Sequence, residues 1–447
     1  MFLSGTDELC TGRPKAVDME RADLVDRLVD PGREGFVFPR YEDYCFANVP
    51  ETALSVLCDS FEQRLPSDVF DGVDTDVSSV VVVVLDGLGY DAFTAAADQL
   101  AISFLDRGQV TPITSVYPSE TTAAMTTFYT GRLPIEHGLL GWFQYLDGIG
   151  RDVVPLPFRT VDGTPLDELA DPVSAETLFA GEALSKRART SGIDVHAVQP
   201  AGISDSAFNG VAFDGADTHG YEDAGDMPAT LRTVLKAVDG PALVHGYDPT
   251  IDAIAHTEGT DSDAYRERVV TAFEELRRDL VDRLDPAVAE RTLLVVTADH
   301  GLIDTGPERN VDLRTTDIWP AFEACLRRDA EGEPRLPTGS PRNTHFHVRP
   351  EKLEEARRAL ESLVDGLVLT RREAVERGLF GAVSTDGAFP EEFPQPFARR
   401  CGDLVAVDRT RSLCWNDDDL THEGMHGGLS RAEMLVPFAV SRLDALQ

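Results

Sequence analysis

The sequence predicts an α/β fold built around a mainly parallel sheet, and two observations support this. Four apolar runs of strand length lie at about 78–85, 193–200, 242–248 and 292–301. The first is an uninterrupted β-branched run that ends in Asp-Gly, which is typical of a central strand buried on both faces. Apolar residues recur at helical spacing over about 262–283, between the last two runs. This alternation of strands and helices indicates a sandwich in which helices cover the sheet.

The composition divides the chain into three parts. The polar N-terminal stretch contains one helical pattern and is expected to wrap around the main domain, whereas a later region rich in Pro, Arg and Glu is expected to be an insert. In the insert, a strand, a helix from Pro350 to Val364 and a second strand predict a small α+β unit. Strand character returns at 403–408 and 433–441, where the chain is expected to rejoin the large sheet. The expected divisions are a wrapping segment, 1–77, a catalytic domain, 78–302 and 403–447, and an inserted cap, 303–402.

The chain is unusually acidic. The 447 residues include 78 Asp and Glu but only 41 Lys and Arg, which gives a formal net charge of −37. We interpret this surplus, which runs along the whole chain, as adaptation to a salty cytoplasm; avoidance of nucleic acids and anionic membranes is the alternative. Tight binding to duplex DNA is not expected. Unfolding or loss of activity at low salt would test the halophilic interpretation.

The sequence shows no membrane span and no disulfide framework. No apolar stretch reaches the roughly 18–20 residues that cross a bilayer, and the first residues lack the pattern of a signal peptide, so a cytoplasmic location is expected. The six cysteines form no C-x-x-C pair and are expected to be free, mostly buried thiols.

Acidic and histidine residues follow three of the four strands. They are Asp86, the pair Asp252 and His256, and the pair Asp299 and His300. In α/β sheets, sites form outside the carboxyl ends of the strands. Residues four apart share a helix face, and mixed Asp/His ligation suits Zn²⁺ better than Mg²⁺. Two such ions about 3.5–4 Å apart can clamp the attacking and leaving oxygens of a phosphoryl displacement.

Two more segments complete the candidate site. The segment 423–438 contributes a late histidine, His426. The segment 117–131, YPSETTAAMTTFYTG, offers hydroxyl nucleophiles, and the residue pattern does not choose among them: Ser119, Thr121, Thr122, Thr126 and Thr127. Thr121 is also a candidate helix N-cap, and a helix start there would help to hold a phosphate.

In their order along the chain, these motifs resemble the alkaline phosphatase superfamily, and most closely its nucleotide pyrophosphatase/phosphodiesterase branch, over about 80–438. The resemblance implies an alkaline-phosphatase-like three-layer α/β sandwich with two divalent ions, Zn²⁺ or alternatively Mn²⁺. It assigns one ion to Asp86, Asp299 and His300, and the other to Asp252, His256 and His426. It places the nucleophile at Thr121, in Y-P-S-E-T, and the oxygen of Thr121 between the two ions.

The chain departs from that branch in one respect. The substrate-binding Asn expected some twenty residues after the nucleophile is missing, because HGLLGW ends at Trp142 there. Asn209, Gln144 or backbone amides are possible substitutes. Trp142, Phe143 and Tyr145 are expected either to line the leaving-group pocket or to pack in the core.

The implied activity is hydrolysis of a small-molecule phosphate ester, which is either a phosphodiester or a nucleotide pyrophosphate. The reaction would pass through a covalent phosphothreonine intermediate. The alternatives are phosphomonoester or phosphonate hydrolysis at the same site and a non-catalytic, metal-stabilised binding protein. Among the other histidines, we expect His345 and His347 on a solvated edge strand, His422 in a loop, and His245 packed and hydrogen-bonded.

Overall fold

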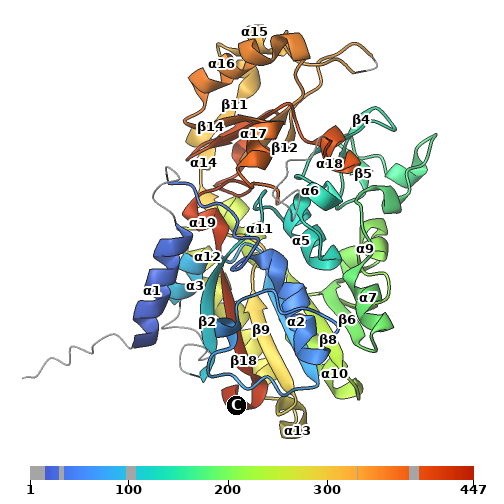
Figure 1. The fold of residues 1–447 in the computed structure, drawn as a ribbon, viewed down its shortest axis with the longest axis vertical. Coiled ribbons are helices and arrows are strands. Elements are labelled where there is room, and N and C mark those ends of the chain that lie inside the picture. The colour runs from blue at the N-terminus through green and yellow to red at the C-terminus, as the bar shows by residue number, and fades with distance from the viewer. Residues whose placement is uncertain (1–15, 30–34, 97–106, 330, 382–391) are drawn as a thin grey trace, which may run out of the picture.

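The computed structural model describes residues 16–29, 35–96, 107–329, 331–381 and 392–447 (Figure 1). Its centre is a seven-stranded sheet in the order β2-β18-β9-β1-β8-β6-β7. The five strands from β9 to β7 are parallel, and β18 runs antiparallel to both of its neighbours. The strands are β1 (Ser79–Leu85), β2 (Gln109–Thr114), β6 (Asp194–Pro200), β7 (Asp217–Tyr221), β8 (Ala242–Asp248), β9 (Thr292–Thr297) and β18 (Leu435–Arg442). The predicted mainly parallel sheet is confirmed.

Strand β1 lies between β8 and β9 and is buried along its whole length. Its run of valines suits this place because β-branched side chains pack well on both faces of a covered sheet. Leu85 pairs with Asp248 of β8, and Val84 pairs with Thr297 of β9. The carboxyl ends of these three strands therefore meet at one edge.

Two groups of helices cover the sheet. In the first, α2, α7 and α9 each contact α5, and α2 also packs on β1 and β8. In the second, α12 packs on α3 and runs into a π-helical turn at Leu276–Val281, which contacts α10. The helices are α2 (Val49–Leu57), α5 (Thr121–Thr130), α7 (Leu184–Thr190), α9 (Ala207–Ala212), α3 (Tyr90–Ala96), α10 (Met227–Ala237) and α12 (Asp263–Glu275). The helix predicted at 262–283 is thus present as α12 and its π-helical continuation.

A four-stranded antiparallel sheet, in the order β12-β13-β15-β14, lies beyond the large one, at the top of Figure 1. Helix α16 (Leu353–Leu363) connects β13 to β14, so the predicted strand–helix–strand unit is present. This sheet has a core of its own, which includes Phe322, Phe346 and Leu360. The strands are β12 (Thr338–Ser340), β13 (Asn343–Phe346), β14 (Gly366–Thr370) and β15 (Leu404–Asp408).

Two expectations about this region are wrong. The strand predicted at 403–408 forms β15, but it pairs with β13 and β14 rather than with the large sheet, which the chain rejoins only at β18. His345 and His347 are also not solvated, because β13 is a central strand and both side chains are buried. Apolar alternation cannot say which of two sheets a strand joins.

A buried ion pair joins the two sheets. Arg342, between β12 and β13, donates from Nε and Nη2 to the two carboxylate oxygens of Glu433, at 2.9 and 2.8 Å, and both side chains are fully buried. Glu433 also accepts hydrogen bonds from the amides of Gly428 and Ser430, which precede β18. The small sheet is therefore fixed to the segment that follows His426.

The remaining described parts lie against these two sheets. Helix α1 (Ala16–Leu28) forms where a helix was predicted, and it contacts β2. A three-stranded sheet of β3 (Gln144–Leu146), β4 (Arg151–Val154) and β5 (Arg159–Thr160) adjoins β12. The described cysteines are all free; Cys10 lies outside the described residues. Within the described chain, no helix is long and apolar enough to span a membrane.

Candidate active site at the carboxyl edge of the sheet

Asp86 is the first residue after β1 and lies where the three central strands end. Its amide donates to the carbonyl of Asp248 (2.9 Å), and its carbonyl accepts from the amide of Asp252 (3.1 Å). Gly87 makes this close approach possible: its φ is +76°, and a Cβ there would lie 2.9 Å from the Asp252 Cα. The backbone therefore brings the helix after β8 directly against Asp86.

That helix, α11 (Thr250–Glu258), begins at the end of β8. The carboxylate of Asp248 accepts hydrogen bonds from the amide and hydroxyl of Thr250, at 2.9 and 2.6 Å, and so fixes the start of the helix. Asp252 and His256 lie four residues apart on one face, with Oδ2 and Nε2 3.3 Å apart. The strand-to-helix turn thus places Asp252 near Asp86, with His256 beside Asp252.

The other predicted ligands come from β9 and from the segment before β18. Nε2 of His300 lies 3.4 Å from Oδ1 of Asp86 and 3.4 Å from Oδ2 of Asp299. Nε2 of His426 lies 3.6 Å from Oδ1 of Asp252. Two sets of ligand atoms lie within 4.8 Å of one another: those of Asp252, His256 and His426, and those of Asp86, Asp252 and His300. The structure therefore brings all six residues together and gives Asp252 a place in both sets.

All three histidines have the same tautomer. Each Nδ1–H donates to a backbone carbonyl: His256 to Gly424 (2.8 Å), His300 to Gly301 (3.2 Å) and His426 to Ser119 (3.3 Å). Since neutral imidazole carries one proton, each Nε2 has a lone pair, and that of His300 faces the hydroxyl of Thr121. Such outer hydrogen bonds fix the orientation of metal-binding imidazoles.

Four carboxylate oxygens of the site lack a hydrogen-bond partner among the described residues. Oδ1 of Asp86, Oδ1 of Asp252 and both oxygens of Asp299 are buried without a hydrogen bond to any described residue. Burial and the neighbouring Asp299 and Asp252 raise the pKa of Asp86. Buried acceptors gathered in this way need a cation. Three carboxylates and three Nε2 lone pairs fit two ions of the zinc type.

Thr121 is the first residue of α5 and faces this site. Its Oγ lies 3.1 Å from Nε2 of His300, and it lines the same pocket as Asp252, His256 and His426. Thr122, the neighbouring candidate, is fully buried and does not line that pocket. The first amides of α5 have no acceptor within the helix and can hold an anion.

The pocket in front of Thr121 has a volume of about 470 Å³. Trp142 and Phe143 line it, whereas Tyr145 packs under the guanidinium of Arg335 instead. The two side chains proposed to replace the missing Asn, Asn209 and Gln144, do not line it. Asn209 donates to Gln199 and to a backbone carbonyl, and Gln144 accepts from the amide of Leu140.

Sequence reasoning missed two side chains of the site. The hydroxyl of Tyr247 donates to Oδ2 of Asp86 and so orients that carboxylate. Glu120 precedes Thr121, is 2% exposed, and has its pKa raised to about 8 by burial. No pattern in the sequence marks a tyrosine inside an apolar strand or a glutamate before a helix as a site residue.

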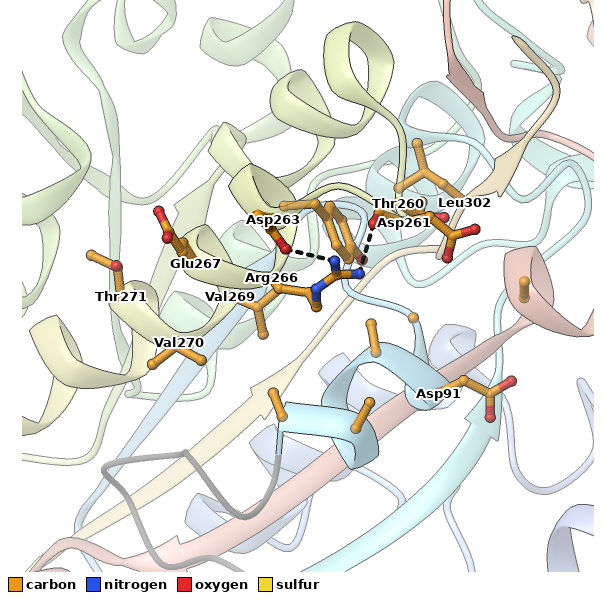
Figure 2. A pocket seen from close by; sticks show the side chains of 16 residues that line it. Asp91, Thr260, Asp261, Asp263, Arg266, Glu267, Val269, Val270, Thr271 and Leu302 are labelled. Carbon is orange, nitrogen blue, oxygen red and sulfur yellow. Dashed lines mark hydrogen bonds and ion pairs between the residues drawn. The ribbon is translucent and has the colours of Figure 1, made fainter.

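Another pocket of the described chain, about 650 Å³, lies beside α3 and α12 (Figure 2). Arg266 crosses it and is already engaged, since its guanidinium donates to Asp263 and to the carbonyl of Asp261 at 2.7 Å each. None of the predicted site residues lines this pocket. The volume of this pocket is therefore no evidence that the active site lies there.

Comparisons with known proteins agree with the fold and identify a family. The profile of the family Type I phosphodiesterase / nucleotide pyrophosphatase matches residues 80–429. Murine ectonucleotide pyrophosphatase / phosphodiesterase 5 is similar in structure, with 18% identity, a TM-score of 0.59, and coverage of 81% of this chain and 87% of that one. Phosphonoacetate hydrolase from Sinorhizobium meliloti is also similar in structure, with 17% identity, a TM-score of 0.58, and coverage of 83% of this chain and 95% of that one. Among curated proteins, none matches this sequence.

The three-layer sandwich and the carboxylate–imidazole cluster at its edge define a protein of the alkaline phosphatase superfamily. Within that superfamily, the chain belongs to the type I phosphodiesterase / nucleotide pyrophosphatase family, since the family profile covers most of its length.

Proposed function

We propose that the protein hydrolyses phosphodiesters or nucleotide pyrophosphates, with Thr121 as the nucleophile. The observation that carries this proposal is the position of Thr121, whose Oγ lies 3.1 Å from Nε2 of His300 at the start of α5. Two divalent ions would be held by Asp86, Asp299 and His300 on one side and by Asp252, His256 and His426 on the other. When bound, they supply positive charge that acidifies the hydroxyl and stabilises the transition state.

The residues of the chain then act in two steps. In the first, Oγ of Thr121 attacks phosphorus, a phosphothreonine ester forms, and the P–O bond to the leaving group breaks, so that the leaving oxygen departs with the bonding electrons and takes a proton. In the second, water attacks phosphorus in line, the P–Oγ bond to Thr121 breaks, and a proton released by the water returns to Oγ. The amides of the first turn of α5 are placed to hold the non-bridging oxygens. In this proposal, these backbone amides bind the phosphate in place of the missing Asn.

Two observations support the choice of a diester and of threonine. Ala123, Ala124 and Met125, which follow the nucleophile, are apolar and buried, and so offer no cation to a second negative charge on phosphorus. A structure of the similar murine protein with AMP is described as an inactive variant in which alanine replaces a threonine.

The first experiment compares hydrolysis of bis-p-nitrophenyl phosphate with that of p-nitrophenyl phosphate in molar KCl, after chelation and again with Zn²⁺ or Mn²⁺ restored. We expect metal-dependent hydrolysis with preference for the diester. Absence of activity on either ester would support the alternative of a metal-stabilised binding protein.

Thr121→Ala tests the nucleophile. We expect turnover to fall by about 10³-fold or more, because no covalent ester can form, while the metal content stays near that of the wild type. Thr122→Val is the matched control, since it removes the neighbouring hydroxyl without changing the volume. Full activity in Thr121→Ala, or loss of activity in Thr122→Val alone, would assign the role to Thr122.

Hydrolysis of phosphomonoesters or phosphonates at the same site is the second candidate. Arg159 of β5 lines the pocket, and its guanidinium has no partner among the described residues, so it is free to meet a further negative charge. If p-nitrophenyl phosphate is the better substrate, and Arg159→Gln abolishes that preference, this candidate replaces the diesterase.

A further inference from the structure

Arg268, in the middle of α12, is a mostly buried cation that reaches the carboxyl edge of the large sheet. Its side chain is 13% exposed, and Nη2 donates to Oδ2 of Asp248 and to Oε2 of Glu275, at 2.9 Å each. Asp248 is the last residue of β8, and its side chain is 1% exposed. A carboxylate at this depth requires a charged partner. Arg268 is that partner.

The same carboxylate holds the first turn of α11. Oδ1 of Asp248 accepts hydrogen bonds from the amide and hydroxyl of Thr250, while Oδ2 accepts from Arg268. The two oxygens of a planar carboxylate cannot turn independently, so the guanidinium that fixes Oδ2 also fixes the direction of Oδ1. Asp252 and His256 lie on one face of the helix that begins there. The orientation of two proposed metal ligands therefore depends on a guanidinium from another helix.

A second side chain of α12 supports the neighbouring turn. Tyr265, three residues before Arg268 and thus on the same helix face, is 3% exposed, and its hydroxyl donates to the carbonyl of Gly87 at 3.1 Å. Gly87 follows Asp86, whose carbonyl accepts from the amide of Asp252. One helix therefore supports both of the turns that carry these carboxylates.

We propose that Arg268 is a positioning residue for the metal site formed by Asp252, His256 and His426. Through Asp248, it holds α11 in the orientation in which Asp252 and His256 face one ion together. Outer groups of this kind change metal affinity by about 10- to 100-fold when they are removed. This role rests on the proposed function, since it assumes the two-ion site, and it adds a residue to that site which no motif marks.

Arg268→Met tests this role, because it removes the guanidinium and keeps an unbranched side chain. We expect the dissociation constant of one of the two Zn²⁺ ions to rise by about 10- to 100-fold, and that of the other to change by less than about 3-fold. Competition with a chromophoric chelator measures both constants in folded protein without substrate. The visible absorption of Co²⁺-substituted protein shows whether the ligand geometry has changed. A residue that only stabilises the fold would lower the melting temperature of the metal-free protein and leave both constants unchanged.

Arg266→Met is the matched control. It makes the same change two residues earlier on α12, where the guanidinium is exposed and donates to Asp263 and to the carbonyl of Asp261. Both dissociation constants should equal those of the wild type. An equal rise in Arg266→Met and Arg268→Met would overturn the assignment, and so would unchanged constants in folded Arg268→Met.

Asp248→Asn tests the same contact from the other side. It leaves no unpaired buried charge, because Arg268 keeps its ion pair with Glu275, and Asn still offers an oxygen to Thr250. We expect the same dissociation constant to rise by about 10-fold. This variant decides the question if Arg268→Met does not fold, and unchanged constants in Asp248→Asn would then overturn the role.

His256→Ala identifies the affected ion. When Arg268→Met is added to His256→Ala, the dissociation constant of the remaining ion should stay within about 3-fold of that in His256→Ala alone, because the site that Arg268 supports is already lost. A further rise of about 10-fold in the double variant would overturn the assignment to α11. Since no measurement requires turnover, a shifted constant in Arg268→Met supports the role even if the wild type hydrolyses no ester. A wild type that binds fewer than two ions would overturn the role even if an ester is hydrolysed.

Discussion

Two groups of histidines in this chain use the imidazole ring in opposite ways. His256, His300 and His426, at the edge of the large sheet, each donate from Nδ1 to a carbonyl and turn Nε2 toward carboxylates. His345 of the small sheet uses both nitrogens internally: Nε2–H donates to Asn343 (3.0 Å), and Nδ1 accepts from the amide of Gly402 (3.1 Å). The first arrangement leaves lone pairs for a ligand, and the second leaves none.

The difference explains why a buried histidine is not in itself evidence of a metal site. Asn343 also accepts a hydrogen bond from the hydroxyl of Tyr117 (2.6 Å) and donates to the carbonyl of Leu140 (2.8 Å). His345 therefore belongs to a satisfied polar network that joins the small sheet to the segment before Thr121. Satisfied networks of this kind make a buried arrangement specific.

The largest expected effect comes from removing one histidine from each group. His256→Ala should lose bound metal and reduce turnover by about 10³-fold, because it removes a proposed ligand. His345→Ala should retain the metal but lower the free energy of unfolding by about 2–4 kcal/mol, because it leaves buried groups unpaired. Elemental analysis and denaturant titration measure the two effects. Loss of metal from His345→Ala would erase the distinction between the two groups.

The next effect tests the link between the two regions. Arg342→Met should lower the free energy of unfolding by about 3–5 kcal/mol, because it leaves the fully buried Glu433 carboxylate unpaired. The double variant Arg342→Met/Glu433→Leu is the control and should lose less, since no lone charge remains. Arg314→Met, which breaks exposed ion pairs, should cost about 1 kcal/mol or less. Equal losses in the single and double variants would show that the ion pair itself contributes little.

The sequence predicted the parts of the molecule that follow local rules. The valine run of β1 and the periodicity of α12 depend on burial of neighbouring residues. Five of the six clustered Asp and His side chains follow strands whose ends meet in any parallel sheet, and only His426 does not. The sheet to which β15 belongs, and the burial of His347 and of Glu120, depend on pairing between distant segments. Such contacts leave no periodic signal in the chain.

One expectation failed for a different reason. His245 is buried and packs against Phe128, Tyr129 and Phe213, as a core residue should, but neither ring nitrogen has a hydrogen-bond partner among the described residues. The strand pattern predicted its burial. It could not predict that aromatic rings would surround the imidazole.

A smaller effect concerns pH. Burial, followed by the charge of Arg371, lowers the pKa of His345 to about 3, below the value of about 6.5 in an unfolded chain. Between these values the unfolded state binds a proton that the folded state does not, so the free energy of unfolding should decrease as pH falls from about 6.5 toward 3. In His345→Gln, stability at pH 7 should be lower, but its dependence on pH between about 7 and 4.5 should be shallower than in the wild type. Parallel pH profiles of the two proteins would contradict a neutral, buried His345.

The smallest effect is a gain in stability at the site itself. In metal-free protein, Asp86 lies close to Asp299 and Asp252, and burial together with these charges raises its pKa. Asp86→Asn removes one like charge and still offers an oxygen to the hydroxyl of Tyr247, so the metal-free variant should be more stable than the metal-free wild type by about 1 kcal/mol. Calorimetry in the presence of a chelator measures this gain. Asp239→Asn, at an exposed carboxylate, should change stability by less than about 0.5 kcal/mol. If restored Zn²⁺ raises the melting temperature of the wild type but not of Asp86→Asn, a bound cation relieves the repulsion among these carboxylates. A metal-free Asp86→Asn variant less stable than the metal-free wild type would show instead that the carboxylates are satisfied without a cation.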